Sequence, residues 1–238
     1  AFGEVVAEFN ADGTPDSHLA YRVSAEVSRE LDARLSTLIG GLVNERFSER
    51  FSERFTRQIL SNKSLVAIHP GASVSYKLWP RDYFVELVRG LEARDYQVLW
   101  VGAGQMDQDI IDAVMAQLPE SSALSLCNQL DFCSLVALFQ RCHCFVGSDS
   151  GPMHLAASTG LPVLALFGPS VEAIWAPLGD NSTVLRGSKA CGKDCDAWHC
   201  EFGYHCLTSL LPDQVLDAVA EHARAPAAAD VASAPPDA

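Results

Sequence analysis

The chain has 238 residues, a formal net charge of −13 and a hydrophobic share of 48%. This length suits one large domain, and the apolar share is enough for a sizeable buried core. The acidic balance excludes a broad nucleic-acid surface, which needs a basic face, so no nucleic-acid partner is expected. A local phosphate site remains compatible with it, because one helix terminus and one lysine suffice.

No apolar run approaches the roughly 20 residues of a membrane-spanning helix, so at most peripheral membrane association is expected. No cleavable signal is visible, which favours a cytoplasmic location. That argument is weak, because the chain opens on Ala1 rather than on Met and its natural start can be absent.

Residues 1–61 are expected to form a helical N-terminal segment. Apolar residues recur at helical spacing from about residue 21 onward. A four-residue echo then places Phe47, Phe51 and Phe55 on one helix face. A stripe of this kind is typical of a packing face rather than of a binding site.

From residue 62 the pattern changes to short apolar runs that alternate with helical stripes. Strands are predicted at 65–69, 97–101, 123–126, 143–147, 162–167 and 183–185, and helices after 80, at 110–118, after Asp131, after 151 and at 211–220. This alternation predicts an α/β fold, a Rossmann-like parallel sheet with helices on both faces, over residues 62–222. Residues 223–238 are rich in Ala, Pro and Asp and are expected to form a disordered tail.

Residues 146–157 (Val-Gly-Ser-Asp-Ser-Gly-Pro-Met-His-Leu-Ala-Ala) predict a strand, a tight turn and a helix. Pro152 suits the first helical turn, and amides near Gly151 would point at an anion such as a phosphate. Asp149 and Ser150 add a carboxylate and a hydroxyl that can grip sugar hydroxyls. The alternative is an ordinary strand–helix connection with Ser150 as a helix cap.

Three further strand ends carry glycine-containing turns, at 70–73, 102–104 and 168–170. The carboxyl ends of parallel strands lie at one edge of a sheet, where ligands bind. The four turns should therefore line one cleft, which favours the binding interpretation of residues 146–157 over the simple cap.

Four cysteines, Cys191, Cys195, Cys200 and Cys206, lie within one short loop. They match a structural tetrathiolate metal site, although the gaps are looser than in a paired Cys-x2-Cys motif. His199 or His205 could replace one ligand. Two disulfides and four free thiols remain alternatives, and every one of these roles is structural rather than catalytic.

Five motifs in order resemble the carboxyl-terminal half of glycosyltransferase family 9, the ADP-heptose:lipopolysaccharide heptosyltransferases. They are His69-Pro-Gly-Ala-Ser73, Lys77-Leu-Trp-Pro80, Asp149-Ser-Gly-Pro-Met-His-Leu-Ala156, Phe167-Gly-Pro-Ser170 and the cysteine cluster before Leu207. The resemblance covers about residues 62–222. It implies one half of a GT-B enzyme, in which two Rossmann-like domains face each other and this half holds the nucleotide sugar.

The resemblance implies transfer of a sugar, heptose above all, from a nucleotide-diphosphate donor with inversion and without a catalytic metal. ADP-heptose is the expected donor, and a lipopolysaccharide core or a protein is the expected acceptor. Such an enzyme would work at the inner face of a bacterial inner membrane. One branch of the family is thought to bind iron at its cysteine cluster, so zinc and iron both remain open for this one.

The resemblance also implies roles for single residues. Lys77 would pair with the diphosphate and steady the departing nucleotide, and Asp149 would hold the donor sugar; these are the two expected catalytic residues. The expected donor-binding set also contains Ser73, Asn128, Leu130, Ser150, Gly151 and His154, of which Asn128 and Leu130 fall where the family lines its adenine pocket.

The sequence departs from the family pattern in two places. The acidic residue that holds the ribose hydroxyls after the second strand is missing, and Gln105 or Asp107 is expected to replace it. The acceptor domain, which supplies the general base, is not recognisable in residues 1–61, which could be its remnant. His69 and His154 are the local candidates for proton transfer. A non-catalytic nucleotide-sugar-binding module therefore remains the alternative function.

Overall fold

A computed structural model describes residues 65–189, 191, 195 and 197–224, together with Arg29 and Ala33. Its strands are β1 (Leu65–His69), β2 (Gln97–Trp100), β3 (Leu124–Ser125), β4 (Cys144–Ser148), β5 (Val163–Phe167) and β6 (Ser182–Arg186). Its helices are η1 (Ser75–Lys77), α3 (Arg81–Glu92), α4 (Gln105–Met115), α5 (Phe132–Phe139), α6 (Gly151–Ser158), α7 (Glu172–Trp175), η2 (Ala197–His199), α8 (His205–Thr208) and α9 (Pro212–Arg224).

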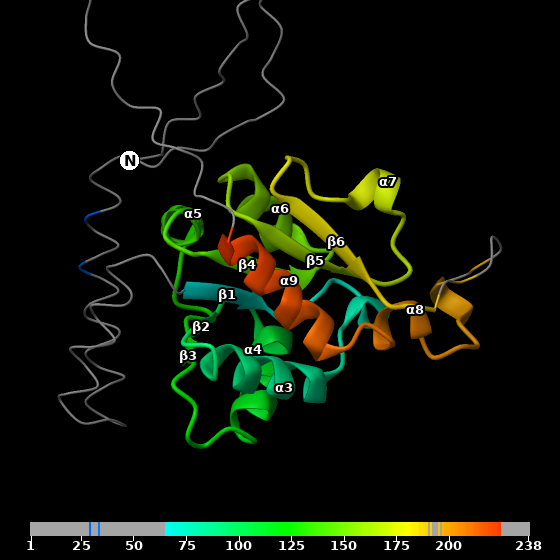
Figure 1. Ribbon diagram of the computed structural model, residues 1–238, viewed down its shortest axis with the longest axis horizontal. Coiled ribbons are helices and arrows are strands. Elements are labelled where there is room, and N and C mark those ends of the chain that lie inside the picture. The colour runs from blue at the N-terminus through cyan, green and yellow to red at the C-terminus, as the bar shows by residue number, and fades with distance from the viewer. Residues whose placement is uncertain are drawn as a thin grey trace, which may run out of the picture.

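The six strands form one all-parallel sheet in the order β3-β2-β1-β4-β5-β6 (Figure 1). The predicted α/β class is therefore confirmed. The strand order reverses between β1 and β4, where Ile68 pairs with Val146 and His69 with Gly147. In open α/β sheets, ligands bind in the crevice outside the strand ends at this reversal. The turns after β1 and β4 thus lie side by side at the expected ligand edge.

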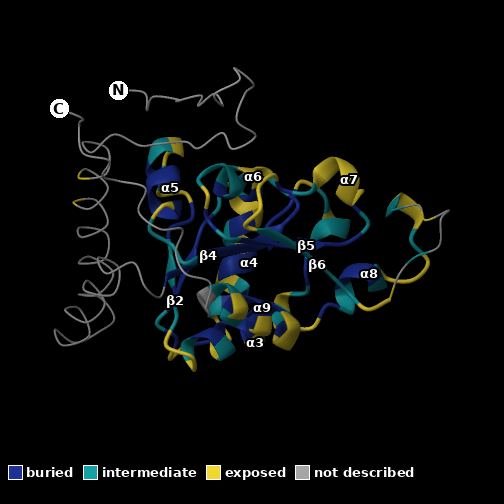
Figure 2. Cartoon of the chain, turned by 45° about the horizontal axis from the view of Figure 1, so that its top comes forward, coloured by how far each residue is buried: buried dark blue, intermediate teal, exposed yellow. Residues whose placement is uncertain are grey.

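Two apolar cores cover the two faces of the sheet. On one face, α3, α4 and α9 pack against Val66 and Ile68; on the other, α5 and α6 pack against Leu65 and Ala67 (Figure 1). The alternation follows from the two-residue period of a strand. Figure 2 shows the central strands as a buried layer between these helices, while the edge strand β6 is of intermediate burial. Each fully buried Leu or Ile stabilises the fold by about 1.5–3 kcal/mol, so the sheet is a rigid support for its loops.

Most predicted elements are present, with shifted ends. Helix α4 begins at Gln105, five residues before the predicted start. The prediction started late because the first turn of the helix is mostly polar and its apolar stripe begins only at Ile110. Asp131 caps α5 as expected, its side chain accepting a hydrogen bond from the Ser134 amide. The short helix α7 and the turns η1, η2 and α8 were not predicted, since three or four residues carry no periodic signal.

The predicted N-terminal helical segment and most of the predicted tail lie outside the described residues. Within the segment only Arg29 and Ala33 are described, and both are helical. Helix α9 runs to Arg224, just past the expected start of the tail. No helix among the described residues is both long enough and apolar enough to cross a membrane.

Candidate functional site

An ion pair between Lys77 and Asp149 lies at the point where the strand order reverses. Lys77 ends η1 after β1, and Asp149 directly follows β4. The Nζ atom donates to Oδ2 of Asp149 at 2.5 Å, across 72 positions of sequence. The Lys77 side chain is 17% exposed and that of Asp149 is 5% exposed. The structure thus brings together the two residues that were expected to be catalytic.

Trp79 fixes the segment that carries Lys77. Its ring is buried against Phe84, with ring centroids 4.9 Å apart, and its indole N–H donates to the Leu210 carbonyl at 2.9 Å. Trp79, two positions after Lys77, is therefore anchored in the main core. The Lys-Leu-Trp-Pro motif therefore has a packing role beside its cationic one.

Asp149 has a second partner, which sequence reasoning did not assign to the site. The Ser170 hydroxyl donates to the same Oδ2 atom at 2.7 Å. Ser170 is itself held by Arg186 at the end of β6, whose guanidinium donates to the Gly168 carbonyl at 2.5 Å and to the Ser170 carbonyl at 2.6 Å. Arg186 thus clamps the turn after β5, and the clamped turn orients the carboxylate of Asp149.

A second buried network links three strand ends. His69 Nε2 lies 3.1 Å from Asp107 Oδ2, and its Nδ1 lies 3.2 Å from the Ser150 hydroxyl. The Ala103 amide also donates to Asp107. Burial alone would raise the pKa of Asp107, but the hydrogen bond to His69, the charge on His69 and the Ala103 amide outweigh it and lower the pKa. Asp107 is therefore a buried, ionised partner of His69.

Glycines make room for this network. A Cβ atom on Gly71 would lie 1.7 Å from Asp107 Oδ1, and one on Gly102 would lie 2.6 Å from Oδ2. Both distances are far inside van der Waals contact, so a side chain at either position would displace the carboxylate. The turns after β1 and β2 thus need glycine because Asp107 fills the space between them.

The network changes the interpretation of two predicted residues. Ser150 occupies the N-cap position of α6, yet its hydroxyl does not bond to a helix amide; it donates to the Ser148 carbonyl and contacts His69. The simple cap interpretation is therefore wrong in its chemistry. His69 has both ring nitrogens engaged, which argues against its use as a base toward an incoming acceptor.

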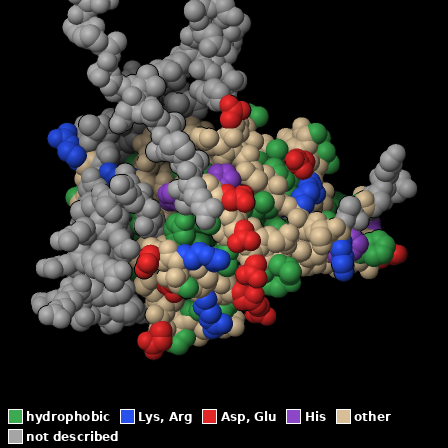
Figure 3. Space-filling view, viewed as in Figure 1, with side chains coloured by type: hydrophobic (Ala, Val, Ile, Leu, Met, Phe, Trp, Pro, Cys, Tyr) green, Lys and Arg blue, Asp and Glu red, His purple; other side chains and the backbone are tan. Residues whose placement is uncertain are grey.

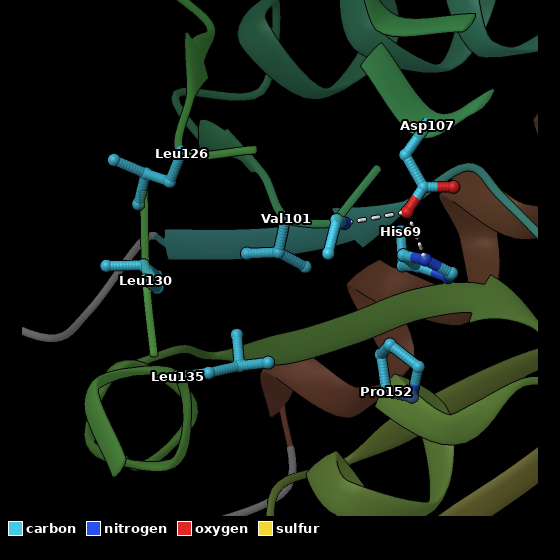
Figure 4. Close-up of a pocket in the computed structure, with 9 residues that line it drawn as sticks. His69, Val101, Asp107, Leu126, Leu130, Leu135 and Pro152 are labelled. Carbon is cyan, nitrogen blue, oxygen red and sulfur yellow. Dashed lines mark hydrogen bonds and ion pairs between the residues drawn. The ribbon is translucent and has the colours of Figure 1, made fainter. Parts of the chain in front are cut away.

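A pocket of about 240 Å³ lies beside this network (Figure 4). Four apolar side chains, Val101, Leu126, Leu130 and Leu135, form one part of its lining, and His69, Asp107 and Pro152 form another. Flat aromatic ligands suit such a pocket, which is mostly apolar with a few polar groups. The pocket adjoins the turn that carries Asp149, because Pro152 belongs to the first turn of α6.

The remaining predicted residues lie at the site to different degrees. Leu130 lines the pocket, whereas Asn128 does not. Asn128 is in the left-handed region (φ 61°), and its side-chain oxygen accepts from the Gly104 amide at 2.7 Å, so it shapes the turn after β2. Ser73, Gly151 and His154 are exposed at the sheet edge. Gln105 is also exposed and donates to Asp109 on its own helix.

One aromatic ring lies beside Lys77, and a small aromatic cluster forms around the preceding residue, Tyr76. The Trp175 ring centroid, on α7, is 5.8 Å from the ammonium. The Tyr76 ring contacts Trp198 at 5.2 Å and Tyr204 at 6.1 Å. On the face in Figure 3, the coloured acidic and basic side chains are interspersed, without a continuous basic area among them.

The cysteine loop is less organised than the sheet edge. Cys191 Sγ lies 3.7 Å from His205 Nε2, and the Tyr204 amide donates to Cys200 Sγ at 3.3 Å. Cys206 is buried while Cys195 is exposed, and none of the four cysteines is in a disulfide. Burial raises the pKa values of Cys191 and Cys206, and this effect outweighs a hydrogen bond from each to another cysteine, which lowers them. Within the described residues no three ligand side chains are arranged to hold a metal ion, so the metal site stays a prediction.

Residues 27–205 match the model of glycosyltransferase family 9 (heptosyltransferase). The chain belongs to this family. The match begins well before residue 62, so family 9 character extends further toward the N-terminus than the five motifs indicated.

Curated family 9 relatives include two heptosyltransferases at 30% identity. Lipooligosaccharide heptosyltransferase 2 of Campylobacter jejuni aligns over 165 residues, 67% of this chain and 51% of its own length. Lipopolysaccharide heptosyltransferase 2 of Escherichia coli K12 aligns over 162 residues, 66% of this chain and 46% of its own length. The chain spans about half the length of the curated relatives it matches.

Solved family 9 structures share the fold. A family 9 glycosyl transferase from Veillonella parvula superposes with a TM-score of 0.69 at 22% identity, covering 87% of this chain and 54% of that one. E. coli ADP-heptose LPS heptosyltransferase II gives 0.65 at 23% identity, covering 86% and 53%. The iron-containing heptosyltransferase TibC, solved with ADP-D-beta-D-heptose, gives 0.51 at 18% identity, covering 68% and 45%.

Proposed function

We propose that this chain is the donor-binding half of a heptosyltransferase that takes ADP-heptose as its donor. The observation that carries the proposal is the Lys77–Asp149 pair at the strand reversal. An ammonium and a carboxylate in contact there are the two groups that a nucleotide sugar requires, one for its diphosphate and one for its sugar hydroxyls. Both side chains are largely buried and so lie in a reduced dielectric, where a charge-assisted contact is stronger than in water.

The base and the diphosphate would occupy adjoining parts of the sheet edge. Adenine would enter the pocket against Leu126, Leu130 and Leu135, which offer an apolar wall for a flat ring. The diphosphate would then extend past Pro152 toward Lys77, over the first amides of α6. A helix N-terminus favours an anion there, which adds to the charge of Lys77. Asp107 is engaged with His69, so the ribose contact falls to another group.

Catalysis would rest on positioning and on stabilising the leaving ADP. When the diphosphate binds, Lys77 would exchange Asp149 for phosphate oxygens and neutralise the charge that develops as the glycosidic bond breaks. Asp149, still held by Ser170, would accept a hydrogen bond from a sugar hydroxyl. An acceptor hydroxyl of a lipopolysaccharide core would attack from the opposite side, with inversion. Its proton would go to a base in an acceptor domain that is not part of this half.

The test starts with calorimetry of ADP on the 238-residue chain. Lys77→Ala should weaken ADP binding roughly ten- to a hundredfold, since a hydrogen bond to a charged group contributes about 1.5–3 kcal/mol. Lys189→Ala is the matched control, because Lys189 is exposed and lies after β6, outside the turns that carry Lys77 and Asp149. Wild-type chain that binds no ADP, or a Lys77→Ala variant that binds it as well as the control does, would contradict the proposal.

A transfer assay with ADP-heptose and a lipopolysaccharide-core acceptor separates the enzyme from a binding module. Heptose transfer by the chain establishes the enzyme. Tight ADP-heptose binding without transfer favours the non-catalytic nucleotide-sugar-binding module or an acceptor half supplied separately.

A further inference from the structure

Trp175 presents a half-exposed indole ring beside Lys77. Trp175 is 50% exposed to solvent, and its ring centroid is 5.8 Å from the Lys77 ammonium. The neighbouring Tyr76 ring is already covered by Trp198 and Tyr204. Within the described part of the chain, Lys77 is the one charged or aromatic partner recorded for the Trp175 ring. The Trp175 ring therefore borders the site, and about half of this residue is accessible to a ligand.

The fold fixes this ring relative to Asp149. Helix α7 follows directly on the turn whose Ser170 hydroxyl holds the Asp149 carboxylate, and the Trp175 amide donates to the Val171 carbonyl at 3.0 Å. Arg186, which clamps that turn, also pairs with Glu172 on α7 at 3.1 Å. Because the turn that holds Asp149 leads directly into α7, Trp175 lies only five residues after Ser170 along the chain.

We infer that Trp175 is the stacking platform for the sugar ring of the nucleotide-sugar donor. This rests on the proposed function, in which Lys77 binds the diphosphate. The sugar is joined to the distal phosphate, so it lies one ester bond beyond the group that Lys77 contacts, within reach of the indole ring. A pyranose has a face of C–H groups with partial positive charge, which packs on the negative face of an aromatic ring.

Two residues would then contact different parts of the sugar. Asp149 accepts a hydrogen bond from a hydroxyl at the ring edge, while Trp175 covers the apolar face and excludes water from the reacting carbon. Val171, Ile174 and Leu178 on the same segment are also exposed and apolar, as a protein-docking surface would be. Sugar stacking and protein docking predict different results. Stacking requires Trp175 alone, whereas a docking surface would use Trp175 and its neighbour Ile174 alike.

The experiment compares ADP-heptose with ADP on the full 238-residue chain by calorimetry. Trp175→Ala should weaken ADP-heptose binding about two- to tenfold, the magnitude of a single aromatic contact, and leave ADP binding unchanged. Trp175→Phe should retain most of the ADP-heptose affinity. Ile174→Ala is the matched control and should change neither affinity, since Ile174 is exposed on the same helix.

Each other outcome overturns the inference. Unchanged ADP-heptose binding in Trp175→Ala excludes stacking. An equal loss for ADP and ADP-heptose assigns Trp175 to the diphosphate or to local folding. An equal loss in Ile174→Ala and Trp175→Ala points to a docking surface. Wild-type chain that binds neither ligand refutes the proposed function itself, whereas wild-type chain that binds ADP and ADP-heptose equally refutes only the stacking.

Discussion

The ligand edge of the sheet and the cysteine loop both gather chemically capable side chains, but they do so in opposite ways. At the sheet edge, His69 hydrogen-bonds to Asp107 and to Ser150, which lie 38 and 81 positions from it in sequence. In the loop, four cysteines lie within 16 residues of sequence and differ widely in burial. Closeness in sequence is thus a poorer guide to a site than the topology of a parallel sheet.

The physical reason is the rigidity of what carries the side chains. Parallel strands in register fix where each strand ends, so the turns after β1, β2, β4 and β5 have little freedom. The described residues between β6 and α9 form the short helices η2 and α8, so strand register does not fix where the four cysteines lie. The comparison predicts large effects for substitutions at the edge and unequal, smaller effects in the loop.

The largest expected effect comes from Asp107. Asp107→Asn should lower the free energy of unfolding by about 1–3 kcal/mol, because His69 and the Ala103 amide lose a charged acceptor in a buried position. Denaturant unfolding at neutral pH measures this. Asp112→Asn is the matched control, since Asp112 is exposed on the same helix and accepts only from Gln108. A loss no larger than that of the control would show that the network does not hold the edge.

The same substitution predicts a pH dependence. The pKa of Asp107 is lowered in the folded chain, so its contribution is fully present above the ordinary value of 3.8 and is lost as pH falls through the lower folded value. The stability difference between wild type and Asp107→Asn should therefore persist down to about pH 4 and narrow below it. Unfolding curves from pH 7 to pH 2.5 test this, and a difference that vanishes near neutral pH would contradict it.

A second effect is expected at Arg186. Arg186→Lys should weaken ADP-heptose binding by about tenfold, since an ammonium cannot bridge the Gly168 and Ser170 carbonyls as a guanidinium fork does. If Arg186 acts through Ser170, the double variant with Ser170→Ala should lose less than the sum of the two single losses. Glu172→Gln is the control, because its ion pair with Arg186 is exposed and contributes about 0–1 kcal/mol. Additive losses would mean that the clamp and the hydroxyl act independently.

The sequence predicted the topology of the edge better than its contacts. Alternating apolar runs and glycine turns predicted that the turns after the strands share one edge, and the family resemblance added Lys77 to that edge; the direct contact between Lys77 and Asp149 was not predicted. Gln105 or Asp107 was expected to hold the ribose hydroxyls, and nothing in the sequence indicated that Asp107 would instead be buried against His69. Arg186 and Trp175 were missed because a strand-end arginine and a four-residue helix carry no pattern of their own.

The smallest effects are expected in the cysteine loop, and they decide between the open alternatives. Cys195 is exposed and Cys206 is buried, so Cys195→Ser should change the free energy of unfolding by less than about 0.5 kcal/mol, whereas Cys206→Ser should cost more because it replaces a buried thiol with a smaller and more polar hydroxyl. Denaturant unfolding of both variants, with metal analysis of the purified chain, measures this. In a tetrathiolate site all four cysteines bind the metal, so Cys195→Ser and Cys206→Ser should lower the free energy of unfolding by similar amounts and release the metal. Equal decreases with release of zinc or iron would therefore establish a metal site and show that the cysteine loop is as well organised as the sheet edge.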